Sequence, residues 1–136
     1  MSVTRVVAAI IMHGDRVLIT RRAPKQSLAG GWEFPGGKVK PSETDRACLV
    51  REIKEELSID ICVGELCTEV VHDYGPFAIN LVAYYCTVSG GEIALTVHDM
   101  YQWVKVEDLL DYNLLPADIQ IAKAVKEHSK DHLYPS

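Results

Sequence analysis

The sequence lacks an apolar run of the ~20 residues that a helix needs to cross a bilayer. It also lacks a basic leader with a small-residue cleavage site, since the apolar stretch at its start is interrupted at His13 and Gly14. The first absence argues against a helical membrane anchor, and the second against a secretory signal. We therefore expect a soluble, cytoplasmic protein with no membrane partner.

Cysteine motifs are missing as well. The four cysteines include no CxxC pair and none of the Cys/His spacings typical of a zinc site, which argues against a structural metal centre. We expect them to be reduced residues of the core. They are Cys48, Cys62, Cys67 and Cys86.

An excess of positive charge is also absent, because the chain carries a net charge of −5. Nucleic-acid phosphates are bound by basic surfaces, so no stable nucleic-acid partner is expected. The local balance is different between positions 21 and 42, where the single acid is Glu33. Five basic residues accompany it, namely Arg21, Arg22, Lys25, Lys38 and Lys40. This segment suits the binding of phosphate groups.

The chain has enough apolar material for one core: 136 residues that are 48% hydrophobic predict a single domain over 1–136. Segments rich in Val and Ile at Val3–Met12 and Arg16–Thr20 predict two antiparallel strands, joined by a turn at His13–Asp15. Four glycines and three prolines in Ala23–Pro41 predict a long loop around a short segment, Trp32–Phe34. A loop of this length in a compact domain is usually functional.

Helix signals begin at Ser42, whose side chain is placed to cap a helix over Glu43–Leu57, with Asp45 as a capping-box-like acid. Enrichment in β-branched and aromatic residues predicts further strands at Ile61–Asp73, Ala78–Val88 and Tyr101–Val104. Val106–Tyr112 predicts a short helical turn. A last helix is expected to begin near Pro116 and to carry Ile119, Ala122 and Val125 on its inner face.

Three glutamates gather on the first of these helices. Steps of 100° per residue place Val50, Ile53 and Leu57 in one core-facing stripe, with the acids nearly opposite, namely Glu52, Glu55 and Glu56. Like charges so spaced cost about 0.2–0.5 kcal/mol per pair, so local propensity alone does not favour them. A solvated acidic face, relieved by Arg51, is one interpretation. A hard divalent cation explains both the acids and the glycine-rich loop before them.

The segment Gly37–Ile59, GKVKPSETDRACLVREIKEELSI, resembles the Nudix box, G-x5-E-x7-R-E-U-x-E-E-x-G-U, in which U is apolar. Eight of the nine specified positions match at fixed spacing over 23 residues. The departure is Ser58, which replaces the second glycine at the helix end, where glycine normally forms a left-handed cap. We expect Ser58 to change the turn and not the metal site.

This resemblance implies roles for the matching residues. A site for Mg²⁺, with Mn²⁺ as an alternative, would be formed by the Gly37 carbonyl, Glu52, Glu55 and Glu56. Arg51 would orient these carboxylates and offset their repulsion. Glu43 is expected to form a structural salt bridge or helix N-terminal contact and not to bind metal.

Beyond the box, the chain resembles compact MutT-type and cytidine-triphosphate pyrophosphohydrolase members, in TRRAPKQSLAGGWEFPGGK and LLPADIQIAKAV. This implies that Arg22 and Lys38 reach substrate phosphates, although both could be exposed loop charges. Asp118 would bind the base edge as an acceptor-only carboxylate, the alternative being a first-turn helix acid. The base would stack on Phe34, Tyr74 or Phe77, which could equally be core residues.

One departure concerns a glutamate that MutT-type enzymes often carry before a Trp-containing strand. Val97 occupies the nearest matching position here, followed by His98 and Asp99. A lone histidine in a loop is usually solvated. We therefore expect Glu55 or Glu52, in preference to His98, to be the general base.

The resemblance implies an α/β Nudix fold, a mixed β-sheet sandwiched between α-helices. It implies hydrolysis of a nucleoside triphosphate to monophosphate and pyrophosphate, with modified, oxidised or CTP-type nucleotides as substrates. An alternative is a dinucleoside polyphosphate or nucleotide-sugar hydrolase acting on substrates such as ADP-ribose, for which Tyr74 and Pro76 are faint support. Another is a non-catalytic nucleotide-sensing module. The oligomeric state is left open.

Overall fold

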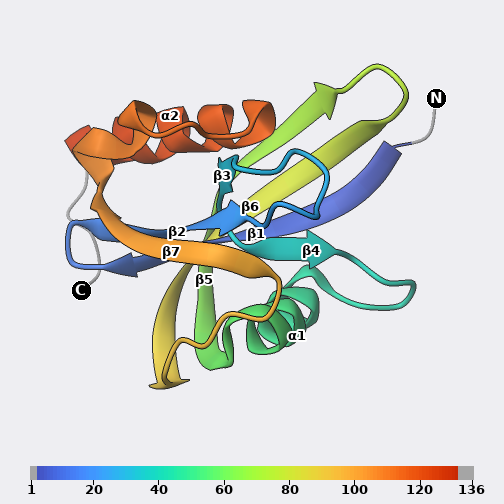
Figure 1. The fold of residues 1–136 in the computed structure, drawn as a ribbon. Helices are drawn as coiled ribbons and strands as arrows, with labels where there is room; N and C mark the ends of the chain where they lie inside the picture. The colour runs from blue at the N-terminus through green and yellow to red at the C-terminus, as the bar shows by residue number, and fades with distance from the viewer. Residues whose placement is uncertain (1–2, 132–136) are drawn as a thin grey trace.

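A computed structural model describes residues 3–131, and its elements form a mixed sheet with helices on both faces (Figure 1). The strands are β1 Val3–His13, β2 Arg16–Arg22, β3 Trp32–Glu33, β4 Gly36–Lys38, β5 Ile59–Asp73, β6 Ala78–Gly91 and β7 His98–Lys105. The helices are α1 Asp45–Leu57, the 3₁₀ helix η1 Val106–Asp111 and α2 Pro116–Asp131. None of these helices is long and apolar enough to cross a membrane.

Strand β1 lies at the centre of the seven-stranded sheet, whose main order is β3-β2-β1-β6-β5. It runs parallel to β6 and antiparallel to β2 and β4, while β7 pairs with the other edge of β2. The predicted hairpin is confirmed by the pairs Met12 with Val17 and His13 with Arg16. Gly14 allows the tight turn because its φ of 63° lies in the left-handed region.

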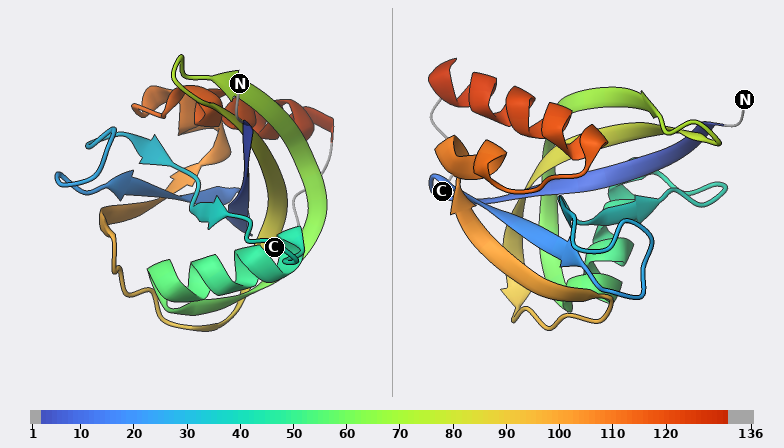
Figure 2. Two further views of the ribbon diagram at one scale, coloured as in Figure 1. Left: turned by 90° about the vertical axis from the view of Figure 1, so that its right-hand side faces the viewer. Right: turned by 45° about the horizontal axis from the view of Figure 1, so that its top comes forward.

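The two faces of β1 belong to two separate cores, which explains why its apolar run is continuous and not alternating. Ala8, Ile10 and Met12 pack in the core on the α2 side. Val7, Ala9 and Ile11 pack in the core on the α1 side. Figure 2 shows α2 and α1 on opposite sides of the strands. The predicted mixed sheet between helices is confirmed.

The predicted cap of α1 is wrong. The helix begins at Asp45, and the Thr44 hydroxyl accepts a hydrogen bond from the Ala47 N–H at 3.1 Å. Ser42 lies in the preceding turn with φ 67°. That turn lets the Glu43 carboxylate accept from the Lys40 N–H at 3.0 Å, which places Glu43 beside the helix and not within it.

The predicted core stripe of α1 is partly wrong, because Val50 is 43% exposed. The buried face consists of Cys48, Leu49, Ile53 and Leu57. Val50 and Glu56 lie about 60° to either side of Ile53 on a helical wheel. Packing against β4 and β5 turns the Glu56 side inward and leaves the Val50 side in solvent.

Several boundaries also differ from the prediction. The loop Ala23–Pro41 contains β3 and β4, two short strands that pair with β2 and β1. Strand β5 begins at Ile59, β6 continues to Gly91, and β7 begins at His98. All four cysteines are free, but only Cys48 and Cys86 are buried. The prediction of a core position is therefore wrong for Cys62, which is exposed on β5.

Candidate active site

The loop before α1 passes so close to α1 on one side and to β1 on the other that two glycines are required. A Cβ on Gly37 would lie 2.3 Å from the carboxyl carbon of Glu52. A Cβ on Gly36 would lie 1.9 Å from the Val7 carbonyl oxygen of β1. The Gly37 backbone therefore lies directly beside the Glu52 carboxylate, as the predicted joint role requires.

Arg51 bonds to Glu43 in the loop before α1 and to two glutamates of the helix itself. Its Nε and Nη2 donate to the two oxygens of Glu43 at 2.7 and 3.0 Å, and this contact lowers the pKa of Glu43 to about 2. Its Nη1 donates to Glu52 at 2.8 Å and to Glu55 at 3.2 Å. The salt bridge predicted for Glu43 is therefore present, and Arg51 contacts two of the three carboxylates it was expected to orient.

Glu56 and Glu52 are crowded together where α1 faces the sheet. The Glu56 side chain is 14% exposed, and burial followed by its hydrogen bond to Glu52 raises its pKa to about 9. Burying a carboxylate directly beside a second carboxylate is costly unless a cation offsets their charge. The donors present therefore fit a divalent cation.

No group of three Asp, Glu, His or Cys side chains within residues 3–131 is already arranged around one metal position. Glu55 accepts from Arg51, and its side chain is 55% exposed. The site therefore fits the pattern in which Mg²⁺ binds through one or two carboxylates together with water and substrate phosphates. The assignment of Glu55 as a third ligand stays a prediction.

A cavity of about 300 Å³ brings the box and the distant residues together. All six predicted substrate residues line it: Arg22, Phe34, Lys38, Tyr74, Phe77 and Asp118. Gly37 and Glu56 line the same cavity, whereas Arg51, Glu52 and Glu55 are not among its lining residues. Nucleotide-sized ligands bind in cavities of this kind, with apolar walls and a few polar groups.

The basic segment around this cavity is partly neutralised. Arg22 donates to the Ser27 carbonyl at 2.6 Å and contacts the Glu33 carboxylate at 3.3 Å. Arg21 forms a two-bond pair with Asp99. Lys38 remains exposed at the cavity. A phosphate group would therefore compete with Glu33 for Arg22, whereas Lys38 is open to solvent.

Asp118, in the first turn of α2, is hydrogen-bonded to the loop Ala23–Pro41. It is 6% exposed, and its Oδ1 accepts a hydrogen bond from the Phe34 N–H at 2.9 Å. Burial raises the pKa of Asp118 well above its usual range. A carboxyl group that favours the neutral form can donate as well as accept. The role of Asp118 as an acceptor toward the base edge stays a prediction.

The three candidate stacking residues differ in their surroundings. Phe34 is 3% exposed and belongs to the α2-side core. Tyr74 and Phe77 stack on each other with ring centroids 5.3 Å apart, and Phe77 is 46% exposed. A nucleobase would therefore meet an open face at Phe77, while Phe34 contributes a buried wall.

The sequence analysis gave no role in the site to Glu33 and ranked His98 below Glu52 and Glu55. His98 was expected to be solvated, but it is 8% exposed, and its Nε2 lies 2.9 Å from Glu33 Oε2. The signal that could have singled out Glu33 was its position as the one acid in a basic segment. Val97 lies where the missing glutamate was expected; it lines the cavity and supplies no carboxylate.

The fold and this arrangement of carboxylates define a Nudix-type site. The chain belongs to the Nudix family, because it matches the NUDIX domain over residues 6–124. It is 38% identical to the CTP pyrophosphohydrolase of Escherichia coli K12 over 124 residues, which are 91% of this chain and 92% of that protein. It is 40% identical to a putative 8-oxo-dGTP diphosphatase 2 of Mycobacterium tuberculosis over 116 residues, 83% and 81% of the two chains.

Solved structures agree with this assignment. The Escherichia coli ORF135 protein superposes with a TM-score of 0.85 at 36% identity, covering 97% of this chain and 94% of that one. The MutT protein of Methanosarcina mazei superposes with a TM-score of 0.83 at 26% identity, covering 94% and 96%. The resemblance drawn from Gly37–Ile59 is confirmed, and the chain is a Nudix hydrolase.

Proposed function

We propose that this Nudix hydrolase converts a nucleoside triphosphate and water into the nucleoside monophosphate and pyrophosphate, with CTP-type or oxidised purine nucleotides as substrates. The observation that carries the proposal is the shared cavity. Gly37 and Glu56 line it together with Asp118 and Phe77, so phosphate chemistry and base recognition fall within the reach of one nucleotide. The names of the bacterial relatives support the same substrate class.

The acidic residues provide for a divalent cation, Mg²⁺ or Mn²⁺. Glu52, Glu56 and the Gly37 carbonyl would hold it, with Glu55 as a further ligand. Such an ion supplies positive charge to phosphate oxygens and lowers the pKa of a bound water. Arg51 keeps the Glu52 carboxylate beside Gly37 through its bond of 2.8 Å.

The remaining residues bind the two ends of the substrate. Lys38 and Arg22 would offset the charge that develops on phosphate oxygens during water attack. Glu52 or Glu55 would accept the proton of the attacking water. Asp118 would read the base edge, and Phe77 with Tyr74 would stack on the ring. Subsequent release of pyrophosphate leaves the nucleoside monophosphate.

The decisive experiment is a screen of nucleotides for Mg²⁺-dependent pyrophosphate release, with product analysis. We expect monophosphate and pyrophosphate from CTP or 8-oxo-dGTP. Cleavage of ADP-ribose instead would favour the nucleotide-sugar alternative, and binding without turnover would favour a sensing module.

A carboxylate variant tests the site within the same screen. Glu56→Gln removes a carboxylate ligand from the cavity and should lower kcat by at least ~100-fold, while the circular dichroism spectrum stays that of the native fold. Glu65→Gln on the exposed part of β5 is the matched control. Near-full activity of Glu56→Gln on every nucleotide would show that the site assignment is wrong.

A further inference from the structure

His98 is held in a fixed orientation at the edge of the cavity. It is the first residue of β7, and its side chain is 2% exposed. Its Nε2 lies 2.9 Å from Glu33 Oε2, and a carboxylate can only accept a hydrogen bond. The proton of the neutral ring therefore sits on Nε2, and Nδ1 carries a lone pair.

That lone pair has no hydrogen-bond partner among the residues that the structure describes. Nδ1 lies 3.9 Å from Glu56 Oε1, which is too long for a hydrogen bond. Both residues line the cavity. A buried polar atom without a partner destabilises the fold, so a lone pair that lies next to a carboxylate favours a bound group that contacts both. A cation meets that requirement.

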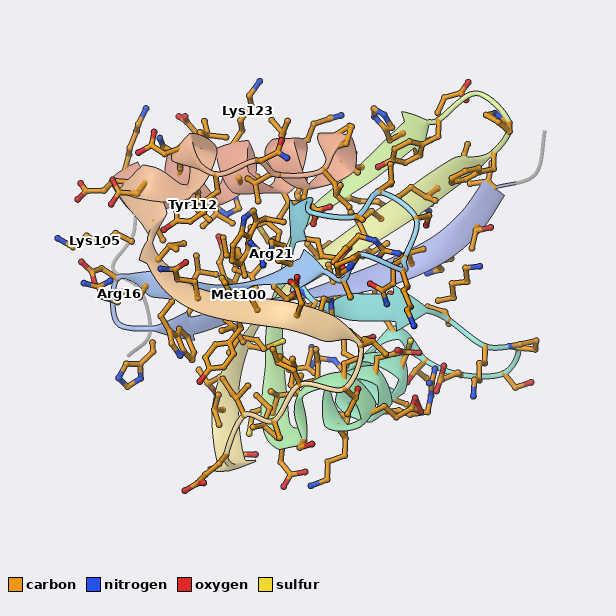
Figure 3. The ribbon with its side chains drawn as sticks, in the orientation of Figure 1. Arg16, Arg21, Met100, Lys105, Tyr112 and Lys123 are labelled. Carbon is orange, nitrogen blue, oxygen red and sulfur yellow. The ribbon has the colours of Figure 1, made fainter. Side chains whose placement is uncertain are left out.

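The strand pairing shows why His98 reaches this position. Arg21 pairs with Met100, whereas Arg22 pairs with His98. Figure 3 labels Arg21 and Met100 on the neighbouring strands β2 and β7. Strand β7 therefore carries one extra residue at this point, Asp99, which pairs with Arg21 outside the cavity. Bulges of this kind re-aim side chains near functional sites. Here the bulge accompanies a buried His98 next to an exposed Asp99.

The Glu33–His98 pair has the form that surrounds metal-binding histidines, in which one ring N–H is held by a carboxylate and the other nitrogen binds the ion. We propose that His98 Nδ1 is a nitrogen ligand of the divalent cation bound by Glu56, with Glu33 as the residue that orients the ring. This rests on the metal site of the proposed function. His98 would thereby supply a metal ligand at the start of β7, next to Val97, whose side chain cannot bind a metal.

A nitrogen donor changes which ion the site favours. Mg²⁺ prefers oxygen ligands, whereas imidazole suits transition ions such as Mn²⁺, Co²⁺ and Zn²⁺ better. Removing His98 should therefore weaken binding of Mn²⁺ much more than binding of Mg²⁺. A histidine that served only to pack the fold would affect both ions alike, through the loss of the folded site.

The test measures metal binding by the nucleotide-free protein. Free Mn²⁺ is followed by electron paramagnetic resonance, and Mg²⁺ affinity is obtained by competition. We expect His98→Leu to lower Mn²⁺ affinity by at least ~10-fold and Mg²⁺ affinity by less than about threefold. His98→Asn places an oxygen or amide near the Nδ1 position and should likewise lose the preference for Mn²⁺. His13→Asn, on the exposed hairpin turn, is the control for adventitious histidine binding.

A second measurement is independent of folding differences between variants. In the wild-type protein, ring ¹⁵N NMR with added Zn²⁺ should move the Nδ1 resonance of His98 and leave its Nε2 bound to hydrogen. Equal losses of Mn²⁺ and Mg²⁺ affinity, unchanged affinities, or a ring that does not respond to Zn²⁺ would each overturn the proposal. Nucleotide turnover in Mg²⁺ is measured separately, so failure here is distinguishable from failure of the proposed function.

Discussion

Gly36 and Gly37 are adjacent, yet each lacks a side chain for a different reason. The position of a Cβ on Gly36 is occupied by the β1 backbone, which is rigid within the sheet. The position of a Cβ on Gly37 is occupied by the end of the Glu52 side chain, which can shift only by giving up its contact with Arg51. The first glycine therefore serves the fold, and the second serves the site.

Alanine at these two positions should separate stability from activity. Gly37→Ala displaces the Glu52 carboxylate and should lower kcat about 100-fold, since small misplacements near the chemistry have effects of this size. Its free energy of unfolding should change by less than about 1 kcal/mol. Gly36→Ala should instead lose about 1–3 kcal/mol through overpacking. Chemical denaturation and pyrophosphate release measure the two quantities; an active Gly37→Ala enzyme would contradict this account.

At the scale of elements, helix α1 ends in a strained residue. Ser58, at the departure from the Nudix box, has φ 62° and ψ 23°, the left-handed conformation that glycine adopts without cost. Its N–H donates to the Lys54 carbonyl at 3.0 Å, and its hydroxyl to the Ala94 carbonyl at 3.3 Å. The cap therefore keeps its glycine-like geometry despite the substitution.

Ser58→Gly should stabilise the protein. Left-handed backbone costs an L-residue about 1–2 kcal/mol, and part of this gain is offset by the lost hydroxyl contact and greater unfolded-state freedom. We expect a net increase of about 0.5–1 kcal/mol and a melting temperature higher by a few degrees, with turnover unchanged. Ser129→Gly within α2 is the control and should destabilise by about 0.5–1 kcal/mol. A lower melting temperature for Ser58→Gly would show that the hydroxyl contact outweighs the strain.

At the scale of the whole molecule, the hydrogen bond from the Phe34 N–H to Asp118 links the loop Ala23–Pro41 to α2. The two residues are 84 positions apart in the sequence. The same bond fixes the cavity wall, because both residues line it. Burial makes the charged form of Asp118 costly, which raises its pKa. The native state therefore holds the Asp118 proton more tightly than the unfolded chain does.

This raised pKa has a defined effect on stability. Its contribution is complete below the unfolded pKa of about 3.9 and is lost as pH rises toward the folded pKa. Asp118→Asn stays neutral and can still accept from the Phe34 N–H. We expect this variant to match wild type near pH 3.5 and to become progressively more stable than wild type as pH rises above about 3.9, measured by thermal unfolding.

A control separates charge from hydrogen bonding at the same position. Asp118→Ala leaves the Phe34 N–H unpaired and should lose about 1–3 kcal/mol at every pH. If Asp118→Asn and wild type differ by the same amount at all pH values, the carboxyl group is not held neutral by burial.

Local sequence determined the parts of this protein that depend on near neighbours. The hairpin around Gly14, the carboxylate spacing from Glu52 to Glu56 and the identity of the Nudix box all follow from residues a few positions apart. The expectation that Ser58 changes the turn at the end of α1 is wrong, because this residue keeps the left-handed conformation of the glycine it replaces. Turn geometry and helical periodicity act over such short distances, so they can be predicted from sequence.

Tertiary structure alone decided which flank of α1 faces inward. Val50 and Glu56 are equally placed beside Ile53 on the helical wheel, and only docking on β4 and β5 buried Glu56. The same holds for His98 and Glu33, which are 65 residues apart, and for the burial that raises the pKa of Asp118. Burial and hydrogen-bond partners are properties of the packed chain, and in this protein they set the electrostatics of the site.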